Sequence, residues 1–212
     1  MTDLVRQLIT VGRKAVAAGL VIGSGGNLSA REPGSDECVV TASGTWLDDL
    51  TPDDFSVVAV ADGQVRSGHP RPSSEVQLHL ATYRVRPDVN AVVHLHPQTS
   101  VLLDALGHPI RLLTIDHAYY VREIRSTPFI QSGTPELAEA GARAAADGCN
   151  CIILGHHGCS ALGATVDLAH KRAANLEEAA RATLTMLQLG DTTTACPPAY
   201  LEHIRATETG GA

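Results

Sequence analysis

The sequence predicts an α/β protein in which a mixed β-sheet lies between layers of helices. Three observations lead to this fold class. Segments with the periodicity of amphipathic helices alternate along the chain with short apolar runs that are typical of strands. Two of the strands meet at Asp62-Gly63, a hairpin turn signal, so at least this pair is antiparallel. A length of 212 residues with 44% hydrophobic residues is sufficient for one domain, which we expect to cover residues 1–212.

Four segments have the apolar spacing and the end signals of helices. The first ends near Gly19, the second lies within residues 71–87, the third within 133–148, and the fourth runs from about Val166 to Leu189. The second has a serine near its start and has Val76, His79, Leu80 and Tyr83 at helical spacing. The third has Thr134 as its cap with Pro135 in the first helical position. The tail from about residue 191 is expected to be partly irregular.

Five apolar runs are expected to be strands or pairs of strands. They lie within residues 37–44, 56–68, 89–96, 109–116 and 150–158. Pro97 ends the third run, because proline cannot donate a hydrogen bond to a neighbouring strand. The stretch GSGGNLS at residues 23–29 is too rich in glycine for a helix or an ordinary strand, so we expect a turn there.

The charge and the composition exclude several functions. A net charge of −7 without a basic run gives no general attraction to nucleic acid or to an anionic membrane, so we expect neither as a partner. The charged N-terminal segment does not resemble a signal peptide, and no stretch is apolar enough to span a bilayer. The five cysteines are an odd number, so reduced thiols in a cytoplasmic protein are expected.

The lysine content narrows the chemistry of any enzyme that forms a carbanion. The chain has two lysines, Lys14 and Lys171, and both fall in expected helices. An enzyme that forms a Schiff base needs a lysine amine in a desolvated site, and neither residue is a good candidate. A metal is therefore the favoured electron sink.

Two stretches combine histidine with the end of an apolar strand. In AVVHLHPQTS, His94 and His96 share one face because strand side chains alternate with a period of two. Two imidazoles on one face can bind one zinc ion at roughly 2.0–2.1 Å. In ILGHHG, His156 or His157 could supply a third ligand and leave a coordination position for water or substrate. Taken alone, each stretch is also compatible with ordinary surface histidines.

A glutamate and three turns complete the candidate site. Glu75 is expected in the first turn of the helix within residues 71–87, where a carboxylate near a serine is also ordinary capping chemistry. The turns GSGGN, TASG and PSS, at residues 23–27, 41–44 and 72–74, could bind an anion with backbone N–H groups and hydroxyls. They could equally be three unrelated loops.

Four stretches, in this order, resemble the class II aldolase/adducin family. They are GSGGNLSAR, VVTASGTWLDDLTPDD, RPSSEVQLHLATYRVRPDVNAVVHLHPQTS and IILGHHGCSALGATVDLAH, and they cover most of residues 19–172. The resemblance implies a three-layer α/β/α fold with a mixed, largely antiparallel central sheet flanked by helices. It also implies a homotetramer with active sites between subunits. The region between His96 and Cys149 departs from the family pattern, and it would shape the pocket for the aldehyde.

The resemblance also implies roles for individual residues. His94, His96 and His157 match the ligands of one divalent metal per subunit, which is zinc in the family's aldolases. Glu75 matches the catalytic glutamate. The residues that match the substrate phosphate site are Ser24, Gly26, Asn27, Ser43, Gly44, Ser73 and Ser74.

The function that the resemblance implies is a metal-dependent aldolase. A ketose 1-phosphate such as L-fuculose 1-phosphate would be cleaved into dihydroxyacetone phosphate and an aldehyde through a metal-stabilised enediolate. The family's proton-donating tyrosine, partly supplied by a neighbouring subunit or a mobile tail, has Tyr119, Tyr120 and Tyr200 as candidates. Two alternatives stay open. The same metal site could serve epimerisation, dehydration or decarboxylation of a related sugar phosphate or acid, or the chain could be a non-catalytic adducin-like binding module.

Overall fold

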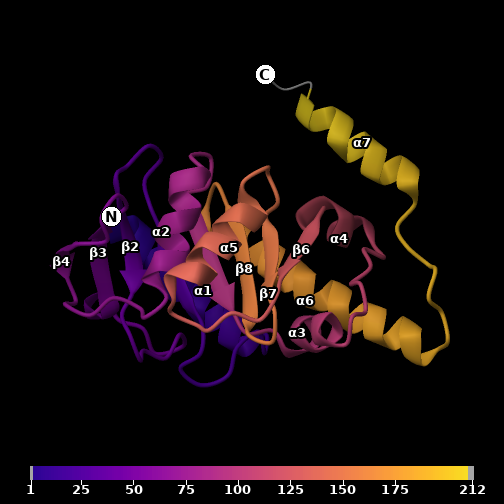
Figure 1. Cartoon of the computed structure of the whole chain (residues 1–212), viewed down its shortest axis with the longest axis horizontal. Helices are drawn as coiled ribbons and strands as arrows, with labels where there is room; N and C mark the ends of the chain where they lie inside the picture. The colour runs from indigo at the N-terminus through magenta and orange to yellow at the C-terminus, as the bar shows by residue number, and fades with distance from the viewer. Residues whose placement is uncertain (1, 210–212) are drawn as a thin grey trace.

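One eight-stranded β-sheet organises the chain, and its strand order is β4-β3-β2-β1-β5-β8-β7-β6 (Figure 1). The structure, a computed structural model, describes residues 2–209. The strands are β1 (Asn27–Ala30), β2 (Glu37–Thr41), β3 (Phe55–Ala59), β4 (Val65–Gly68), β5 (Ala91–Leu95), β6 (Ile124–Thr127), β7 (Cys151–Leu154) and β8 (Gly158–Gly163). Neighbouring strands are antiparallel except for β6 and β7, which are parallel. The predicted mixed, largely antiparallel sheet is confirmed.

Within residues 2–209, seven α-helices and one short 3₁₀-helix accompany the sheet. They are α1 (Thr2–Ala17), the 3₁₀-helix Pro52–Asp54, α2 (Val76–Val85), α3 (Gln98–Ala105), α4 (Ile115–Tyr120), α5 (Pro135–Ala145), α6 (Val166–Gln188) and α7 (Pro198–Thr209). Thr134 and Thr165 cap α5 and α6 by accepting a backbone N–H from the first turn. None of the helices within residues 2–209 is both long and apolar enough to cross a bilayer.

Two hydrophobic cores, one on each face of the sheet, make the three layers. On one face, Leu8 of α1 and Leu176 of α6 pack with Val93 of β5. On the other face, Leu78 of α2 packs with Val92 of β5. Because side chains alternate along a strand, His94 projects from the same face as Val92, which is the face that α2 covers. The fold therefore brings the start of α2 close to the end of β5.

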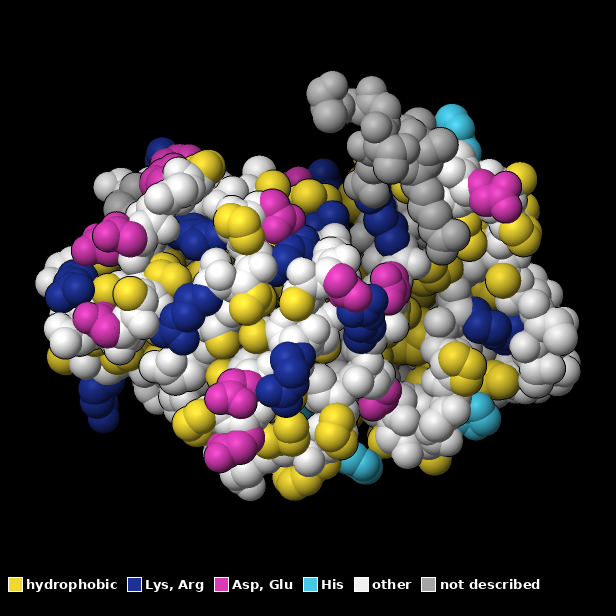
Figure 2. Space-filling view, turned by 45° about the horizontal axis from the view of Figure 1, so that its top comes forward, with side chains coloured by type: hydrophobic (Ala, Val, Ile, Leu, Met, Phe, Trp, Pro, Cys, Tyr) yellow, Lys and Arg dark blue, Asp and Glu magenta, His cyan; other side chains and the backbone are white. Residues whose placement is uncertain are grey.

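The face of the molecule that Figure 2 shows carries mixed charge. On the face of the molecule in Figure 2, lysine and arginine side chains alternate with aspartate and glutamate side chains.

A buried glutamate fixes the segment that follows the His94–His96 strand. Helix α3 begins directly after Pro97, whose side chain cannot accept a hydrogen bond from the first turn. Glu177 of α6 takes over this role by accepting the N–H groups of Thr99 and Ser100 at 3.2 and 2.9 Å. The chain on the C-terminal side of His96 is thus attached to the longest helix of the fold.

Some segment predictions are wrong. Residues 109–114 form no strand: the N–H of Arg111 donates to the Thr183 hydroxyl of α6, and the carbonyl of Leu112 accepts from Cys196. Strand β1 begins inside the stretch 23–29 that was expected to be a turn. The structure adds α3, α4, β6 and β8, which the sequence did not indicate. The tail is irregular only up to Pro197, since α7 follows.

Candidate active site

Three histidines converge where β5 ends beside the turn between β7 and β8. His94 pairs in register with Asn27 of β1 on one side and with Ser160 of β8 on the other. The ring centroids of His94, His96 and His157 lie 5.1, 4.9 and 5.0 Å apart, which is a nearly equilateral triangle. Residues that are 61 positions apart in the sequence therefore face one another.

The donor atoms of these rings fit a divalent metal. One ligand atom from each histidine and one from Glu75 all lie within 4.8 Å of one another. The Nε2 atoms of His94 and His96 are 3.2 Å apart, and two nitrogens on a tetrahedral ion at 2.0–2.1 Å lie roughly 3.3 Å apart. Burial lowers the pKa of His96 to about 4 and also lowers the pKa of His157, so both imidazoles are neutral at pH 7 and offer a lone pair.

Two glycines permit this close packing. A Cβ atom on Gly158 would lie 2.6 Å from the His96 ring and 2.5 Å from the carbonyl oxygen of Leu95. Gly26 has a φ of +73°, and its Cβ would lie 2.7 Å from the carbonyl oxygen of His94. A larger residue at either position would displace the chain that carries the imidazoles.

The backbone at His156 decides which histidine of the GHHG turn faces the cluster. His156 has a φ of 57°, in the left-handed region that non-glycine residues rarely adopt. Its side chain is exposed and lies beside Phe129, whereas His157 reaches Glu75. Of the two histidines in this turn, His157 is therefore the one that lies within the cluster.

Glu75 lies directly before α2 and faces the histidine cluster, whereas it was expected within the first turn of the helix. It is the residue that precedes α2, not a residue of the first turn, and its side chain makes no capping hydrogen bond. Its two carboxylate oxygens instead lie 3.1 Å from Nε2 of His94 and 3.3 Å from Nε2 of His157. Burial opposes ionisation, but the hydrogen bond and charge of His94, with His157 and Asn27, lower the pKa of Glu75 to about 2. The interpretation as ordinary capping is wrong.

A buried hydrogen-bond chain holds this carboxylate. Nδ2 of Asn27 donates to Glu75 at 3.1 Å, so Oδ1 of Asn27 must accept from Nε2 of His79. Nδ1 of His79 then accepts from the Ser29 hydroxyl at 2.6 Å, and Ser29 accepts from the Tyr83 hydroxyl at 2.7 Å. Burial lowers the pKa of His79 to about 3, which keeps its ring neutral. The sequence assigned no role to His79, although its helical spacing placed it on the buried face.

A small cleft of about 170 Å³ opens beside the cluster. Glu75, His96 and His157 line it together with all seven residues that match the phosphate site: Ser24, Gly26, Asn27, Ser43, Gly44, Ser73 and Ser74. Ser132, which the sequence did not single out, lines it as well, and none of the described lining residues is lysine or arginine. An anion in this cleft would have to be held by hydroxyls and N–H groups.

Two of the three turns are bonded to each other. The N–H of Ser43 donates to the carbonyl of Arg71 at 3.1 Å, and the N–H of Ser73 donates to the carbonyl of Thr41 at 2.9 Å. These two backbone donors are therefore not available to a ligand, contrary to the expectation for the turns. The hydroxyls of Ser43 and Ser73 remain on the cleft wall.

The candidate tyrosines lie away from the cleft of their own chain. Tyr119 and Tyr120 are at the end of α4, where their rings contact each other at a centroid distance of 5.0 Å. Helix α4 packs on α6 and α7, and Tyr200 of α7 belongs to the small cluster between α4 and α7. Neither Tyr119 nor Tyr120 is among the described residues that line the cleft.

Comparison with known proteins agrees with this geometry. The family model described as "Class II Aldolase and Adducin N-terminal domain" matches residues 6–184. An L-fuculose phosphate aldolase of Methanocaldococcus jannaschii is 36% identical over 86% of this chain and 96% of its own. A 5-methylthioribulose-1-phosphate/5-deoxyribulose-1-phosphate aldolase of Rhodospirillum rubrum is 37% identical over 87% of this chain and 81% of its own.

Two further similarities concern the reaction and the fold. A 3-oxo-tetronate 4-phosphate decarboxylase of Haemophilus influenzae is 30% identical over 88% of this chain and 90% of its own. A solved L-fuculose 1-phosphate aldolase superposes with a TM-score of 0.88 at 27% identity, covering 99% of this chain and 97% of that one. The family match and these relatives lead to one conclusion: the chain belongs to the class II aldolase and adducin family.

Proposed function

We propose that this protein is a divalent-metal-dependent aldolase that cleaves a ketose 1-phosphate into dihydroxyacetone phosphate and an aldehyde. The observation that carries the proposal is the position of the Glu75 carboxylate, 3.1 Å from Nε2 of His94, on the wall of a cleft that offers hydroxyls to a phosphate. L-fuculose 1-phosphate is the first substrate to test, because two of the similar proteins carry its name.

His94, His96 and His157 would hold the metal, and their three imidazole nitrogens suit zinc. A divalent metal bound there would act as a Lewis acid that stabilises negative charge developing on the substrate oxygens. The hydroxyls of the phosphate turns would bind the substrate phosphate and so orient the carbon chain. Glu75 would exchange the proton on the carbon next to the substrate carbonyl, since it is ionised and its position is fixed by Asn27.

The proton on the aldehyde oxygen requires a further group. We infer that Tyr119 or Tyr120 of a neighbouring subunit supplies it in a homotetramer. Support comes from their place on the molecule: Tyr119 is 49% exposed on α4, and no tyrosine is among the described residues that line the cleft. A tyrosine on the surface of one subunit could reach the cleft of the next.

The direct test is release of dihydroxyacetone phosphate from L-fuculose 1-phosphate and from 5-deoxyribulose 1-phosphate by the metal-loaded protein. Removing the metal with a chelator should lower the rate by about 10³-fold or more, because Lewis-acid stabilisation contributes several kcal/mol. Adding zinc should restore the rate. Equal rates before and after chelation would contradict the proposal.

Decarboxylation is the second candidate, favoured by the similarity to the 3-oxo-tetronate 4-phosphate decarboxylase. It would use the same histidines and the same phosphate turns, so the residues within the cleft do not separate the two reactions. Carbon dioxide released from 3-oxo-tetronate 4-phosphate, without dihydroxyacetone phosphate from either ketose phosphate, would select it. A non-catalytic module has no need of the buried chain that holds Glu75.

A further inference from the structure

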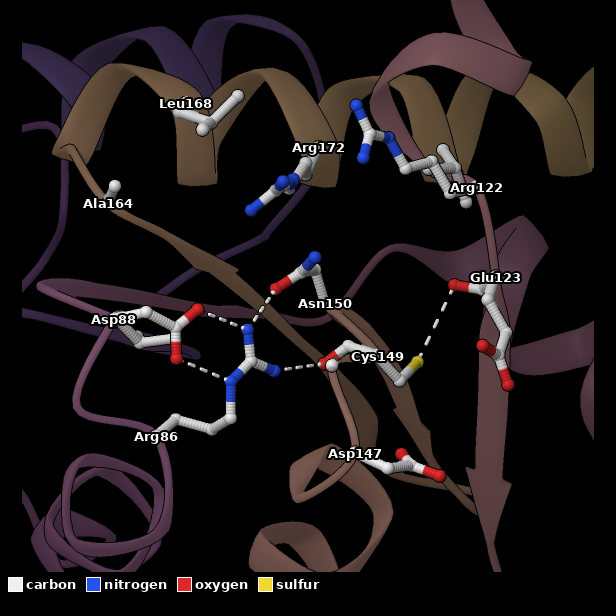
Figure 3. Close-up of a pocket in the computed structure, with 13 residues that line it drawn as sticks. Arg86, Asp88, Arg122, Glu123, Asp147, Cys149, Asn150, Ala164, Leu168 and Arg172 are labelled. Carbon is white, nitrogen blue, oxygen red and sulfur yellow. Dashed lines mark hydrogen bonds and ion pairs between the residues drawn. The ribbon is translucent and has the colours of Figure 1, made fainter. Parts of the chain in front are cut away.

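A second, larger pocket lies at the opposite end of the central strands from the cleft. Its volume is about 530 Å³, which is within the range of small-molecule sites, roughly 300–1,000 Å³. It forms where β5 and β7 begin and β8 ends, and Figure 3 shows it in close-up. Val89 on its wall precedes His94 by five residues, which corresponds to roughly 16 Å along an extended strand.

Arg86 forms the frame of this pocket and is not available to a ligand. It is 6% exposed, and all five of its N–H donors are engaged. Two bond the carboxylate of Asp88 at 2.8 and 2.7 Å, one bonds the carbonyl of Cys149, and one bonds Oδ1 of Asn150 at 3.0 Å (Figure 3). The fifth donor bonds the carbonyl of Ala145 at 2.9 Å. This arginine and its carboxylate neutralise each other within the pocket wall.

The bond to Arg86 fixes the direction of the Asn150 amide. Because Oδ1 accepts from Arg86, Nδ2 of Asn150 must point away from it, towards Arg172 in Figure 3. Within residues 2–209 this amide nitrogen has no hydrogen-bond acceptor. The pocket therefore contains two N–H groups with a fixed direction and no partner from the described chain.

Arg172 brings an uncompensated positive charge to the same space. Its Nη1 donates to the carbonyl of Leu162 at 2.6 Å, while its Nε is buried without a hydrogen-bond partner. No carboxylate of the described residues forms an ion pair with it. Burial of the guanidinium, reinforced by the charges of Arg122 and Arg86, lowers the pKa of Arg172. A partly buried guanidinium whose Nε has no hydrogen-bond acceptor favours a bound anion.

The other charges on the wall do not remove this excess. Arg122 lies near Arg172 on the same side of the pocket (Figure 3). The two remaining acidic residues of the wall, Glu123 and Asp147, both form ion pairs with Arg125, which lies outside the lining. Their negative charge is therefore largely directed away from Arg172.

The backbone at Arg122 is strained. Arg122 has a φ of 63°, and the only other non-glycine residue with positive φ in the described chain is His156, next to the histidine cluster. Such a conformation costs of order 1–3 kcal/mol and is concentrated at functional sites. In this conformation Nε of Arg122 donates to the carbonyl of Tyr119 at 3.1 Å, and the guanidinium lies over the Tyr119 ring.

We propose that this pocket binds a small oxyanion, a phosphate or a carboxylate group, through Arg172 and the amide of Asn150, at a site separate from the metal cleft. The bidentate geometry of guanidinium suits either group. The volume exceeds that of the oxyanion itself, and Val89, Val121 and Leu168 give the pocket an apolar part. The ligand would then be an anionic metabolite with a carbon skeleton.

Asn150→Asp gives a nearly isosteric test. The new carboxylate can still accept the hydrogen bond from Arg86, but it removes the two N–H donors and repels an anion. Gln64→Glu is the matched control: Oε1 of Gln64 accepts from Arg66 at 3.4 Å in the β3–β4 hairpin, at the other end of the sheet. Both variants change one amide to one carboxylate beside an arginine.

The measurement is equilibrium dialysis of the full-length, metal-loaded protein against labelled inorganic phosphate and, separately, against malonate. We expect a binding site whose affinity for at least one probe falls about tenfold or more in Asn150→Asp and in Arg172→Gln, since a charge-assisted hydrogen bond contributes about 1.5–3 kcal/mol. Gln64→Glu should bind as the original protein does. The probe with the stronger effect identifies a phosphate or a carboxylate ligand.

Two results would overturn the proposal. In the first, Asn150→Asp, Arg172→Gln and Gln64→Glu all bind both probes equally well. Any phosphate bound would then belong to the metal cleft alone. In the second, the Asn150 and Arg172 variants lose the oligomeric state while the control keeps it. Probe binding does not change in any of the variants. The pocket would then accept a carboxylate of a second copy of the chain. Unfolding curves of the variants check that each is folded.

Discussion

Two buried glutamates, Glu75 and Glu177, show how this chain distinguishes a structural carboxylate from a chemical one. Glu177 is 1% exposed, and its oxygens accept four hydrogen bonds, from the N–H groups of Thr99 and Ser100, the Ser100 hydroxyl and Nε of Arg181. Glu75 is 7% exposed, yet one of its oxygens is buried without a hydrogen bond.

The difference between the two lies in what remains unpartnered. Burying a carboxylate is costly unless donors satisfy it, and α3 and α6 satisfy Glu177 completely. At Glu75 the fold leaves one oxygen facing the imidazole of His157 at 3.3 Å. Both glutamates are buried, but only Glu177 has hydrogen bonds to both of its oxygens. This difference indicates that Glu177 serves the fold and that Glu75 is kept for a ligand or a proton.

The largest effect is expected from Glu75→Ala. Turnover should fall by roughly 10²–10⁴-fold, the usual contribution of a positioned acid or base, while the protein stays folded. The measurement is the rate of aldol cleavage together with proton exchange on dihydroxyacetone phosphate. Exchange that continues at the original rate would remove Glu75 from the proton transfer.

Glu177→Ala should have the opposite effect, a loss of stability with little change in turnover. Loss of the acceptor leaves the buried N–H groups of Thr99 and Ser100 without partners, so the free energy of unfolding should fall by about 3 kcal/mol. Turnover per folded molecule should change far less than in the Glu75 variant. Denaturant unfolding measures the effect, with Glu139→Ala as the control. Glu139 is 70% exposed, and a surface change of this kind stays within about 0.5 kcal/mol. Equal losses in both variants would contradict the structural role of Glu177.

An intermediate effect on turnover is expected from His79→Leu, which interrupts the series of hydrogen bonds between Tyr83 and Glu75. Removal of such a supporting group typically lowers activity about 10–100-fold, and here kcat should fall more than KM rises because His79 does not line the cleft. His79→Gln, whose amide can both donate and accept, should recover part of the loss. A purely structural histidine would lower stability without this recovery of kcat.

The smallest effect is expected from Tyr83→Phe, at the far end of the same chain. The hydrogen bonds of the Tyr83 hydroxyl to the Ser29 hydroxyl and to the Val92 backbone disappear, and each corresponds to about 1 kcal/mol of unfolding free energy. Turnover should stay close to that of the original protein. If Tyr83→Phe slowed the reaction as strongly as His79→Leu, the chain would transmit protons and not merely hold Glu75 in place.

Local patterns predicted the parts of the site that lie on regular elements. The period-two alternation of β5 placed His94 and His96 on one side, and helical spacing placed His79 on the buried face of α2. The GHHG turn could not be resolved in the same way. The side that each histidine faces depends on the φ of 57° at His156, which no residue type dictates.

Contacts between distant segments decided the rest. The apolar run at 109–114 has the composition of a strand, but Thr183 of α6 accepts the N–H of Arg111 and the segment stays irregular. The series of hydrogen bonds that links Glu75 to Tyr83 passes through Asn27 and Ser29. These two residues lie 52 and 50 positions before their common partner His79. A sequence pattern cannot specify pairings of this range.

The bonds between the turns at 41–44 and 71–74 have a consequence for selectivity. Because their backbones are attached to each other at 2.9 and 3.1 Å, the cleft wall is rigid before any substrate arrives, and little loop entropy is lost when a phosphate binds. A rigid wall of this kind accepts the end common to many sugar phosphates. Discrimination among them then depends on whatever surrounds the opposite end of the sugar, beyond the reach of these two turns.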